Sequence, residues 1–265
     1  MQNSISRFDQ FYAEVYGERW ESLKHALLNP AEKITRSCFQ GYAEYRLDRA
    51  SILAAEALQV KAGDLVLDLC AAPGGKALIL AEKMGVTGSL VANELSSARR
   101  MRLKDVVAQH VPEALRNRIQ VTNFDGNQFG LKRKEAFDRI LLDAPCSSEQ
   151  HLLEEDPTQL DWKESRTKQL AMRQYSLLCS ALLALKKGGT LVYSTCSISP
   201  LENDGVVGRL LTKKKNEVEL DREVSDLIDY EKTEFGFQIF PDLASGIGPI
   251  YFARLKKPLS FLESD

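Results

Sequence analysis

Short apolar runs alternate with amphipathic stretches through the middle of the chain. The runs, each of strand length, cover residues 65–69, 89–94, 119–124, 137–143, 190–195 and 249–257. Between them, apolar side chains recur at helical spacing in residues 75–84, 97–109 and 166–185. Strands that alternate with helices in this way predict a parallel, doubly wound α/β sheet.

The flanks of this pattern are less regular. Residues 8–29 place apolar side chains at helical spacing, and residues 48–59 predict a second helix. A loop rich in Glu, Asp and Pro is expected over residues 144–163. The long helix that follows it is expected to close at Gly188 and Gly189.

The composition narrows the possible classes of protein. With 44% hydrophobic and 27% charged residues, the chain resembles an ordinary soluble globular protein. It has no run of about 18 apolar residues, which excludes a membrane span, and its N-terminus lacks a signal-peptide pattern. The cysteines form no C-x-x-C pair and only three histidines are present, so we expect no metal site. An odd number of thiols without a signal peptide indicates reduced cysteines and a cytoplasmic location.

A glycine-containing loop follows the first strand and opens a helix. Its sequence is D-L-C-A-A-P-G-G-K, residues 68–76. In doubly wound sheets the ligand lies beyond the carboxyl ends of the strands, against such a turn. Gly74 and Gly75 allow close backbone approach, and Pro73 stiffens the loop. The loop lacks the G-x-G-x-x-G spacing of a dinucleotide site, which disfavours NAD.

Acidic residues follow the next two strands. Glu94 is placed to bind ribose hydroxyls, and Asp125 is placed to accept a hydrogen bond from an adenine amino group. Both suit S-adenosylmethionine, because its adenosine and its positively charged sulfonium favour nearby acceptors and carboxylates. The alternative is that each acid caps a helix or is simply solvated. Their matching positions after successive strands favour the ligand.

Two cysteines occupy equivalent places after two further strands. The fourth strand ends in D-A-P-C, with the thiol of Cys146, and the fifth ends in S-T-C-S, with Cys196. Neighbouring strands would bring both thiols beside the methyl group of the cofactor. A single cysteine is more often a small buried hydrophobe, and we interpret three in that way: Cys38, Cys70 and Cys179.

The motifs DLCAAPGGK, DAPCS and YSTCSISPLEN resemble those of the Nop/Sun (RsmB-like) family of S-adenosylmethionine-dependent RNA cytosine carbon-5 methyltransferases. The resemblance covers residues 44–212, together with GPIYFARLKK near the C-terminus. The segments FDQFY, YGERW and HVPEALR look most like the mitochondrial small-subunit rRNA branch. The family implies a Rossmann-like class I methyltransferase with a mostly parallel seven-stranded sheet and helices on both faces. Residues 46–265 would form this catalytic domain, after a short helical N-terminal extension over residues 1–45.

The resemblance also implies roles for individual residues. A thiolate at Cys196 would add to carbon 6 of cytosine and so activate carbon 5. Asp143 would hydrogen-bond the ring nitrogen or the amino group, and Cys146 would assist product release, as base or as its helper. The implied cofactor-binding residues are Cys70, Ala71, Ala72, Pro73, Gly74, Gly75, Lys76, Glu94, Arg99, Asp125 and Asp143.

The chain departs from the family pattern in places. Glu94 stands where the family more often has Asp, and Arg99 has basic neighbours, Arg100 and Arg102, that could be confused with it. The sequence SSEQHLLEEDP after Cys146 replaces the commoner loop with glycine and arginine, which leaves substrate contacts there open. In DNA cytosine methyltransferases the Pro-Cys thiol is the nucleophile, so the choice of Cys196 depends on the family resemblance.

The charge is distributed unevenly. Residues 217–242 hold nine acidic against two basic residues, a net −7 within a total of −2, which leaves +5 on the rest. A mildly basic body is compatible with phosphate contacts but falls short of an autonomous RNA binder. We therefore expect RNA, in a ribosomal particle or with a protein partner that supplies specificity, and neither DNA nor a membrane. The expected function is rRNA cytosine-C5 methylation; the alternatives are tRNA methylation and a ribosome-assembly factor with little turnover.

Overall fold

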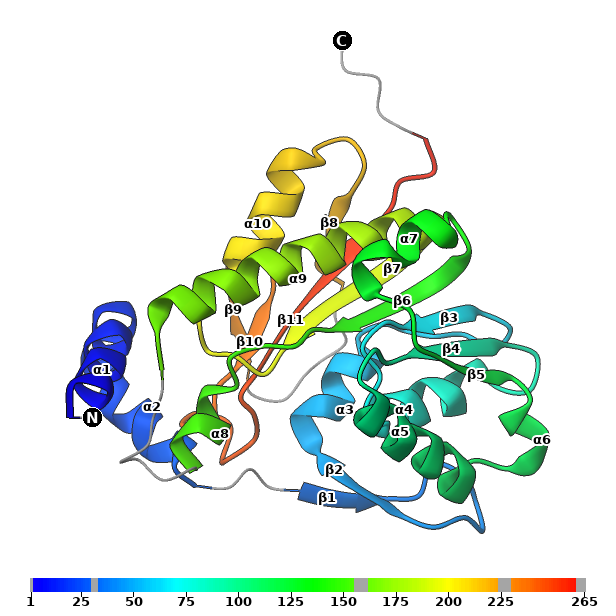
Figure 1. Cartoon of the computed structure of the whole chain (residues 1–265), viewed down its shortest axis with the longest axis horizontal. Coiled ribbons are helices and arrows are strands. Elements are labelled where there is room, and N and C mark those ends of the chain that lie inside the picture. The colour runs from blue at the N-terminus through cyan, green and yellow to red at the C-terminus, as the bar shows by residue number, and fades with distance from the viewer. Residues whose placement is uncertain (1, 30–32, 155–161, 224–229, 261–265) are drawn as a thin grey trace.

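A mixed β-sheet forms the centre of the molecule (Figure 1). The computed structural model describes residues 2–29, 33–154, 162–223 and 230–260. One half of the sheet is parallel and contains β3 (Leu65–Asp68), β4 (Ser89–Asn93), β5 (Ile119–Thr122), β6 (Phe137–Asp143) and β7 (Leu185–Thr195). The other half is antiparallel and contains β8 (Glu219–Asp221), β9 (Glu231–Lys232), β10 (Phe237–Ile239) and β11 (Ile250–Lys256).

The strand order is β5-β4-β3-β6-β7-β11-β10-β9, with β8 paired to β11. The order reverses between β3 and β6, as in a doubly wound fold, so that prediction is confirmed. The described residues contain nine strands in this sheet where seven were expected. β8, β9 and β10 are two or three residues long, too short for the alternation by which a strand is recognised.

Helices cover both faces of the sheet (Figure 1). One face carries α3 (Arg49–Glu56), α4 (Gly75–Met84) and α5 (Ser97–His110), and the other carries α7 (Gly126–Lys132), α9 (Glu164–Ala184) and α10 (Asp204–Lys213). The strands alternate between two cores: Leu141 faces the first, whereas Ile140 and Leu142 face the second. The short α6 (Glu113–Arg116) precedes β5. Of the helices described, none combines the length and apolarity that a membrane span requires.

The predicted close of the long helix at two glycines is wrong. α9 ends at Ala184, and β7 begins at the next residue and includes Gly188 and Gly189. β7 pairs with β6 from its first residue, with a register shift between Phe137 and Arg139. Gly188 has φ +77, a conformation that glycine adopts readily, and it lies in the irregular part of this strand pair.

The N-terminal region packs against the loops that follow β6 and β7. α1 (Gln2–Tyr16) and α2 (Trp20–Leu27) are separated by a 3₁₀ turn, η1 (Gly17–Arg19), in place of the one helix expected. Gly17 has φ +58, which interrupts a continuous helix. Their aromatic side chains form a third core with Ile198 and Phe240. β1 (Lys33–Arg36) then pairs with β2 (Tyr45–Asp48) in a separate two-stranded sheet.

The expected loop over residues 144–163 contains a short helix, α8 (Glu149–Glu154). Its first turn is stabilised by contacts with a distant loop, which no local pattern announces. Residues 155–161 of this expected loop lie outside the described residues, as do residues 224–229 of the acidic segment.

α7 approaches α9 so closely that Gly130 has no space for a side chain. A Cβ atom there would lie 2.1 Å from the carbonyl oxygen of Ser180. We expect Gly130→Ala to lower the free energy of unfolding by about 3 kcal/mol, because one helix must shift. Gln128→Ala on the exposed side of the same helix should change it by less than ~0.5 kcal/mol. Urea unfolding measures both, and equal effects would contradict this close packing.

Candidate active site

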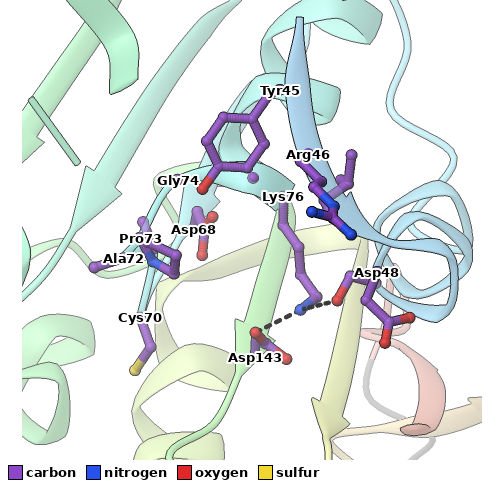
Figure 2. Close-up of a pocket in the computed structure, with 14 residues that line it drawn as sticks. Tyr45, Arg46, Asp48, Asp68, Cys70, Ala72, Pro73, Gly74, Lys76 and Asp143 are labelled. Atoms are coloured by element: carbon purple, nitrogen blue, oxygen red, sulfur yellow. Dashed lines mark hydrogen bonds and ion pairs between the residues drawn. The ribbon is translucent and has the colours of Figure 1, made fainter. Parts of the chain in front are cut away.

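The loop after β3 is fixed from both sides. Leu69 N–H donates to Leu141 O, and Ala71 N–H donates to Asn93 O, which attaches the loop to neighbouring strands. A Cβ on Gly74, where φ is +123, would lie 2.9 Å from Val106 Cγ1. Glycine therefore lets the loop approach α5, a contact that the sequence analysis did not anticipate. The four residues before it also line the cavity shown in Figure 2: Cys70, Ala71, Ala72 and Pro73.

Asp68 is a site residue that the sequence reasoning missed. It ends β3, is fully buried, and lines the same cavity (Figure 2). Neither carboxylate oxygen has a hydrogen-bond partner among the described residues. Burial, followed by the nearby charge of Asp143, raises the pKa of Asp68 to about 8. A buried carboxylate without a partner fits a positively charged cofactor; its place at a strand end before the glycine loop was the signal available in the sequence.

The free energy of unfolding should report the state of Asp68. Between its ordinary pKa of 3.8 and about 8, the folded protein holds a proton that the unfolded chain has lost. Stability is therefore lost as the pH rises, by about 2 kcal/mol between pH 6 and pH 8. Asp68→Asn, which cannot titrate, should remove this part of the slope. Thermal or urea unfolding at a series of pH values measures it, and identical slopes would contradict the assignment.

Lys76 and Asp143 form an ion pair across the cavity. Lys76 Nζ lies 2.7 Å from Asp143 Oδ2 (Figure 2). It also contacts Ser51 Oγ at 3.2 Å. Burial alone would lower the pKa of Lys76, but the charge and hydrogen bond of Asp143 raise it. The Ser194 hydroxyl donates to the other oxygen, Oδ1, at 2.8 Å. These contacts hold a charged carboxylate at the end of β6 in a fixed orientation.

Glu94 and Asp125 line one cavity, as expected from their positions. Both also act locally: Glu94 Oε1 accepts from Ser96 N–H at 2.9 Å, and Asp125 caps α7 through Asn127 N–H at 3.0 Å. The capping alternative is therefore correct in part. Glu94 Oε2 and Asp125 Oδ2 can still accept hydrogen bonds from a ligand.

Arg99 is distinguished from its basic neighbours by its contacts. Its guanidinium donates to Ala72 O at 2.6 Å and lies 3.5 Å from Glu94 Oε2, so it connects the glycine loop to the acid after β4. Arg100 instead binds the backbone carbonyls of residues 94 and 95, and Arg102 is exposed. Arg99 is thus the arginine that lines the cavities on both sides of the loop.

The two thiols meet at the ends of β6 and β7. Cys146 Sγ and Cys196 Sγ are 3.0 Å apart, and the Ser148 hydroxyl lies 3.0 Å from Cys196 Sγ. Both cysteines line a cavity together with Asp143 and Lys76. Hydrogen bonds, first from Cys146 and then from Ser148, lower the pKa of Cys196, while the bond to Cys196 raises the pKa of Cys146. Cys196 is exposed, so the more acidic thiol is also the more accessible one.

Two thiols and a fixed carboxylate line a cavity at the carboxyl edge of a doubly wound sheet, and this arrangement defines the class as a Rossmann-like methyltransferase. A family model described as 16S rRNA methyltransferase RsmB/F matches residues 55–256, and the chain belongs to this family. The predicted family, the S-adenosylmethionine-dependent RNA cytosine-C5 methyltransferases, is therefore confirmed. In the described part of the chain, no group of three or more His, Cys, Asp or Glu residues is arranged to hold a metal ion.

Similar proteins support the assignment. A 5-cytosine rRNA methyltransferase NSUN4 of Bos taurus is 38% identical over 80% of this chain and 59% of its own length. A mitochondrial tRNA (cytosine(34)-C(5))-methyltransferase of Mus musculus is 35% identical over 87% of this chain and 68% of its own. The crystal structure of NSun6 from Pyrococcus horikoshii with SFG matches with a TM-score of 0.71 and 25% identity, over 85% of this chain and 56% of that one. The chain thus spans about three fifths of the length of the NSUN4 relative.

Proposed function

We propose that this protein methylates carbon 5 of a cytosine in ribosomal RNA, through a covalent bond between Cys196 and the base. The observation that carries the proposal is the placement of two thiols 3.0 Å apart beside the ion-paired Asp143. RNA or cofactor binding alone needs neither thiol, so the pair favours an enzyme over an assembly factor without turnover. NSUN4, the relative with 38% identity, is an rRNA methyltransferase by name, which favours rRNA as substrate.

The cofactor site fits S-adenosylmethionine, because Asp68 offers an unpartnered buried carboxylate and Glu94 and Asp125 offer acceptors in one cleft. When bound, S-adenosylmethionine supplies an electrophilic methyl group on a positively charged sulfur. Arg99 would keep the glycine loop and Glu94 together around it. The glycine-loop backbone would form one wall of the cleft, where a side chain at Gly74 would displace α5.

The chain's own residues account for the steps on the base. The Cys196 thiolate adds to carbon 6 of the cytosine, and the electron pair moves toward the ring nitrogen and carbon 5. Asp143, held by Lys76 and Ser194, accepts a hydrogen bond from the amino group or from the protonated ring nitrogen of the base. After methyl transfer, Cys146 releases its own thiol proton to solvent, since the Cys196 sulfur is now bonded to the base, and then takes the carbon-5 proton; alternatively, it directs a water that does so. Cys196 then leaves as a thiolate and the double bond re-forms.

The target base must leave its stack to reach thiols at the end of the sheet. Ser148, with φ +51, and Gln150 line the cavity beside the thiols, in the loop that departs from the family pattern. These two side chains are the substrate contacts that we assign to this loop. The mildly basic body supports a protein partner or a folded ribosomal particle as the source of RNA specificity. Free thiols throughout the chain support a reducing compartment such as the cytoplasm.

Labelled S-adenosylmethionine and three RNA substrates test the proposal: small-subunit particles, the same rRNA without protein, and total tRNA. We expect label in small-subunit rRNA, at a cytosine that bisulfite sequencing no longer finds methylated in a deletion strain. Label in tRNA alone would replace rRNA by the tRNA alternative. Tight RNA binding with no methylcytosine lost anywhere would favour the assembly factor and overturn the enzyme proposal.

A further inference from the structure

Two glutamates lie buried beneath the cysteine loops, and neither belongs to the machinery described above. Glu149 begins α8 in the loop after β6, and Glu202 follows β7. Both are fully buried. Among the described residues, no lysine or arginine forms an ion pair with either one. Two carboxyl groups in such surroundings need hydrogen-bond donors, a proton, or both.

The donors come from the opposite loop in each case. Glu149, which lies three residues after Cys146, accepts from Ile198 N–H at 3.1 Å and from the Ser197 hydroxyl at 3.0 Å, directly after Cys196. Glu202, on the Cys196 side, accepts from Ser147 N–H at 3.0 Å. Each carboxyl group therefore binds the backbone beside the other thiol. The two glutamates cross-connect the loops that present Cys146 and Cys196.

One hydroxyl indicates where a proton is held. Ser147 Oγ lies within hydrogen-bond distance of both Glu149 Oε1 and Glu202 Oε1. A hydroxyl has one hydrogen, so it can donate to one carboxylate and must accept from the other group. Acceptance requires that one carboxyl group be protonated. Gln174 supports Glu202 further by donating to its Oε2 at 2.6 Å.

The N-terminal helix is connected to the same pair. The Tyr12 hydroxyl of α1 donates to Glu149 Oε1 at 2.6 Å, and the Tyr16 hydroxyl donates to Ile198 O. Tyr12 is fully buried within the third core, so α1 is held against the loop that carries Glu149. A helix outside the sheet thus contacts the loops of both thiols.

We propose that Glu149 and Glu202 form a reciprocal clamp, with one shared proton, that sets the separation of the Cys146 and Cys196 thiols, and that α1 adjusts the clamp through Tyr12. Both glutamates are positioning residues, since they act through the loops and do not face the cavity. Their effect on methylation rests on the proposed function. Their effect on the thiol separation does not.

The charges around the pair define its pH dependence. Among the described residues, the titratable groups that face it are Tyr12 and Tyr16 from α1, Tyr193 from β7, and the two thiols, and none of them is cationic. Burial, followed by the charge of Glu149, raises the pKa of Glu202 to about 7. Above that pH the clamp loses its proton and two like charges face each other. The loops should then separate.

Phenylarsine oxide, which binds two adjacent thiols, tests the clamp without RNA or cofactor. Binding to the full chain should disappear in Cys146→Ala, which assigns it to this pair. At pH 6.5 we expect Glu202→Ala to weaken binding by about tenfold or more, because buried donors lose their partner. Glu202→Gln, which keeps the shape and cannot titrate, should restore most of the affinity.

The pH profile separates positioning from mere folding. In the wild type, affinity for phenylarsine oxide should fall as the pH rises through about 7, and Glu202→Gln should lack this fall. Tyr12→Phe removes one hydrogen-bond donor to the charged carboxylate. In this variant the affinity for phenylarsine oxide should therefore fall at a higher pH than in the wild type. Asp204→Asn is a matched control: the Asp204 carboxylate accepts from Tyr251, Thr233 and two backbone N–H groups, and none of these hydrogen bonds goes to a loop that carries a thiol. It should behave like the wild type.

Methylation provides the second measurement. Glu202→Ala should lower kcat and leave the KM for S-adenosylmethionine within about twofold, because the cofactor cleft is untouched. Wild-type affinity and pH profile in both Glu202 variants would overturn the clamp. If the wild type methylates no RNA, the proposed function fails, while the arsenical measurement still decides on the clamp. If Glu202→Ala does not fold, Glu202→Gln and Tyr12→Phe still test the shared proton through the position of the inflection.

Discussion

Cys196→Ala is expected to reduce methyl transfer by at least about a thousandfold, since the variant lacks the thiol that we propose adds to carbon 6. The proposed nucleophile is the thiol whose pKa is lowered by hydrogen bonds from Cys146 and Ser148, and it is the exposed member of the pair. Removing it leaves Asp68, Glu94 and Asp125 in place. Binding of S-adenosylmethionine, measured by calorimetry, should therefore stay within about threefold of the wild type.

The matched control is Cys179→Ala. Cys179 is a half-buried thiol in α9 that packs against the second core, away from the cavity. This variant should retain nearly full turnover. Substantial activity in Cys196→Ala would overturn the nucleophile assignment and direct attention to Cys146, the thiol of the Pro-Cys motif.

Cys146→Ala is expected to trap the reaction at a later point. With Cys196 intact the base can still be attacked, but the carbon-5 proton is no longer removed efficiently and the thioether persists. We expect turnover to fall by about a hundredfold or more and a protein–RNA adduct to accumulate. Denaturing electrophoresis detects the adduct as a band of reduced mobility. The double variant with Cys196→Ala should form none.

Cys146→Ala should also change the pH dependence of adduct formation. The bond from Cys146 lowers the pKa of Cys196, so the variant should have a less acidic nucleophile. Adduct formation in Cys146→Ala should consequently require a higher pH than the first step in the wild type. Normal turnover without adduct would show that Cys146 has no part in release. An unchanged pH profile would contradict the hydrogen bond between the thiols.

Several parts of the site could be read from the order of residues along the chain. Lys76, Glu94, Asp125, Asp143 and both thiols follow strands that hydrophobic patterning identifies. The carboxyl ends of parallel strands lie at one edge of a sheet, so these side chains were expected to meet there. The structure places them in neighbouring cavities at that edge, which share Cys70 as a lining residue.

Other parts had no local signal. Among the residues that the structure describes, Asp68 lacks a hydrogen-bond partner because no donor of a neighbouring element reaches its carboxylate. Arg99 is distinguished from Arg100 and Arg102 by the path of the glycine-containing loop, which brings Ala72 O beside it. Strands of two or three residues, such as β9, are defined by their partner and not by their own pattern.

The sequence by itself determined the fold class, the positions of the parallel strands along the chain, and the placing of a glycine-containing loop and two thiols after strands. Periodic burial carries this information, because each strand must present alternate side chains to two cores. Only the tertiary structure decided how the thiols are held. The contacts from Glu149 to Ser197 and from Tyr12 to Glu149 span 48 and 137 residues, and buried polar groups follow no repeat. Their partners are selected by the requirement that every buried donor and acceptor be satisfied, which becomes visible only once the chain is folded.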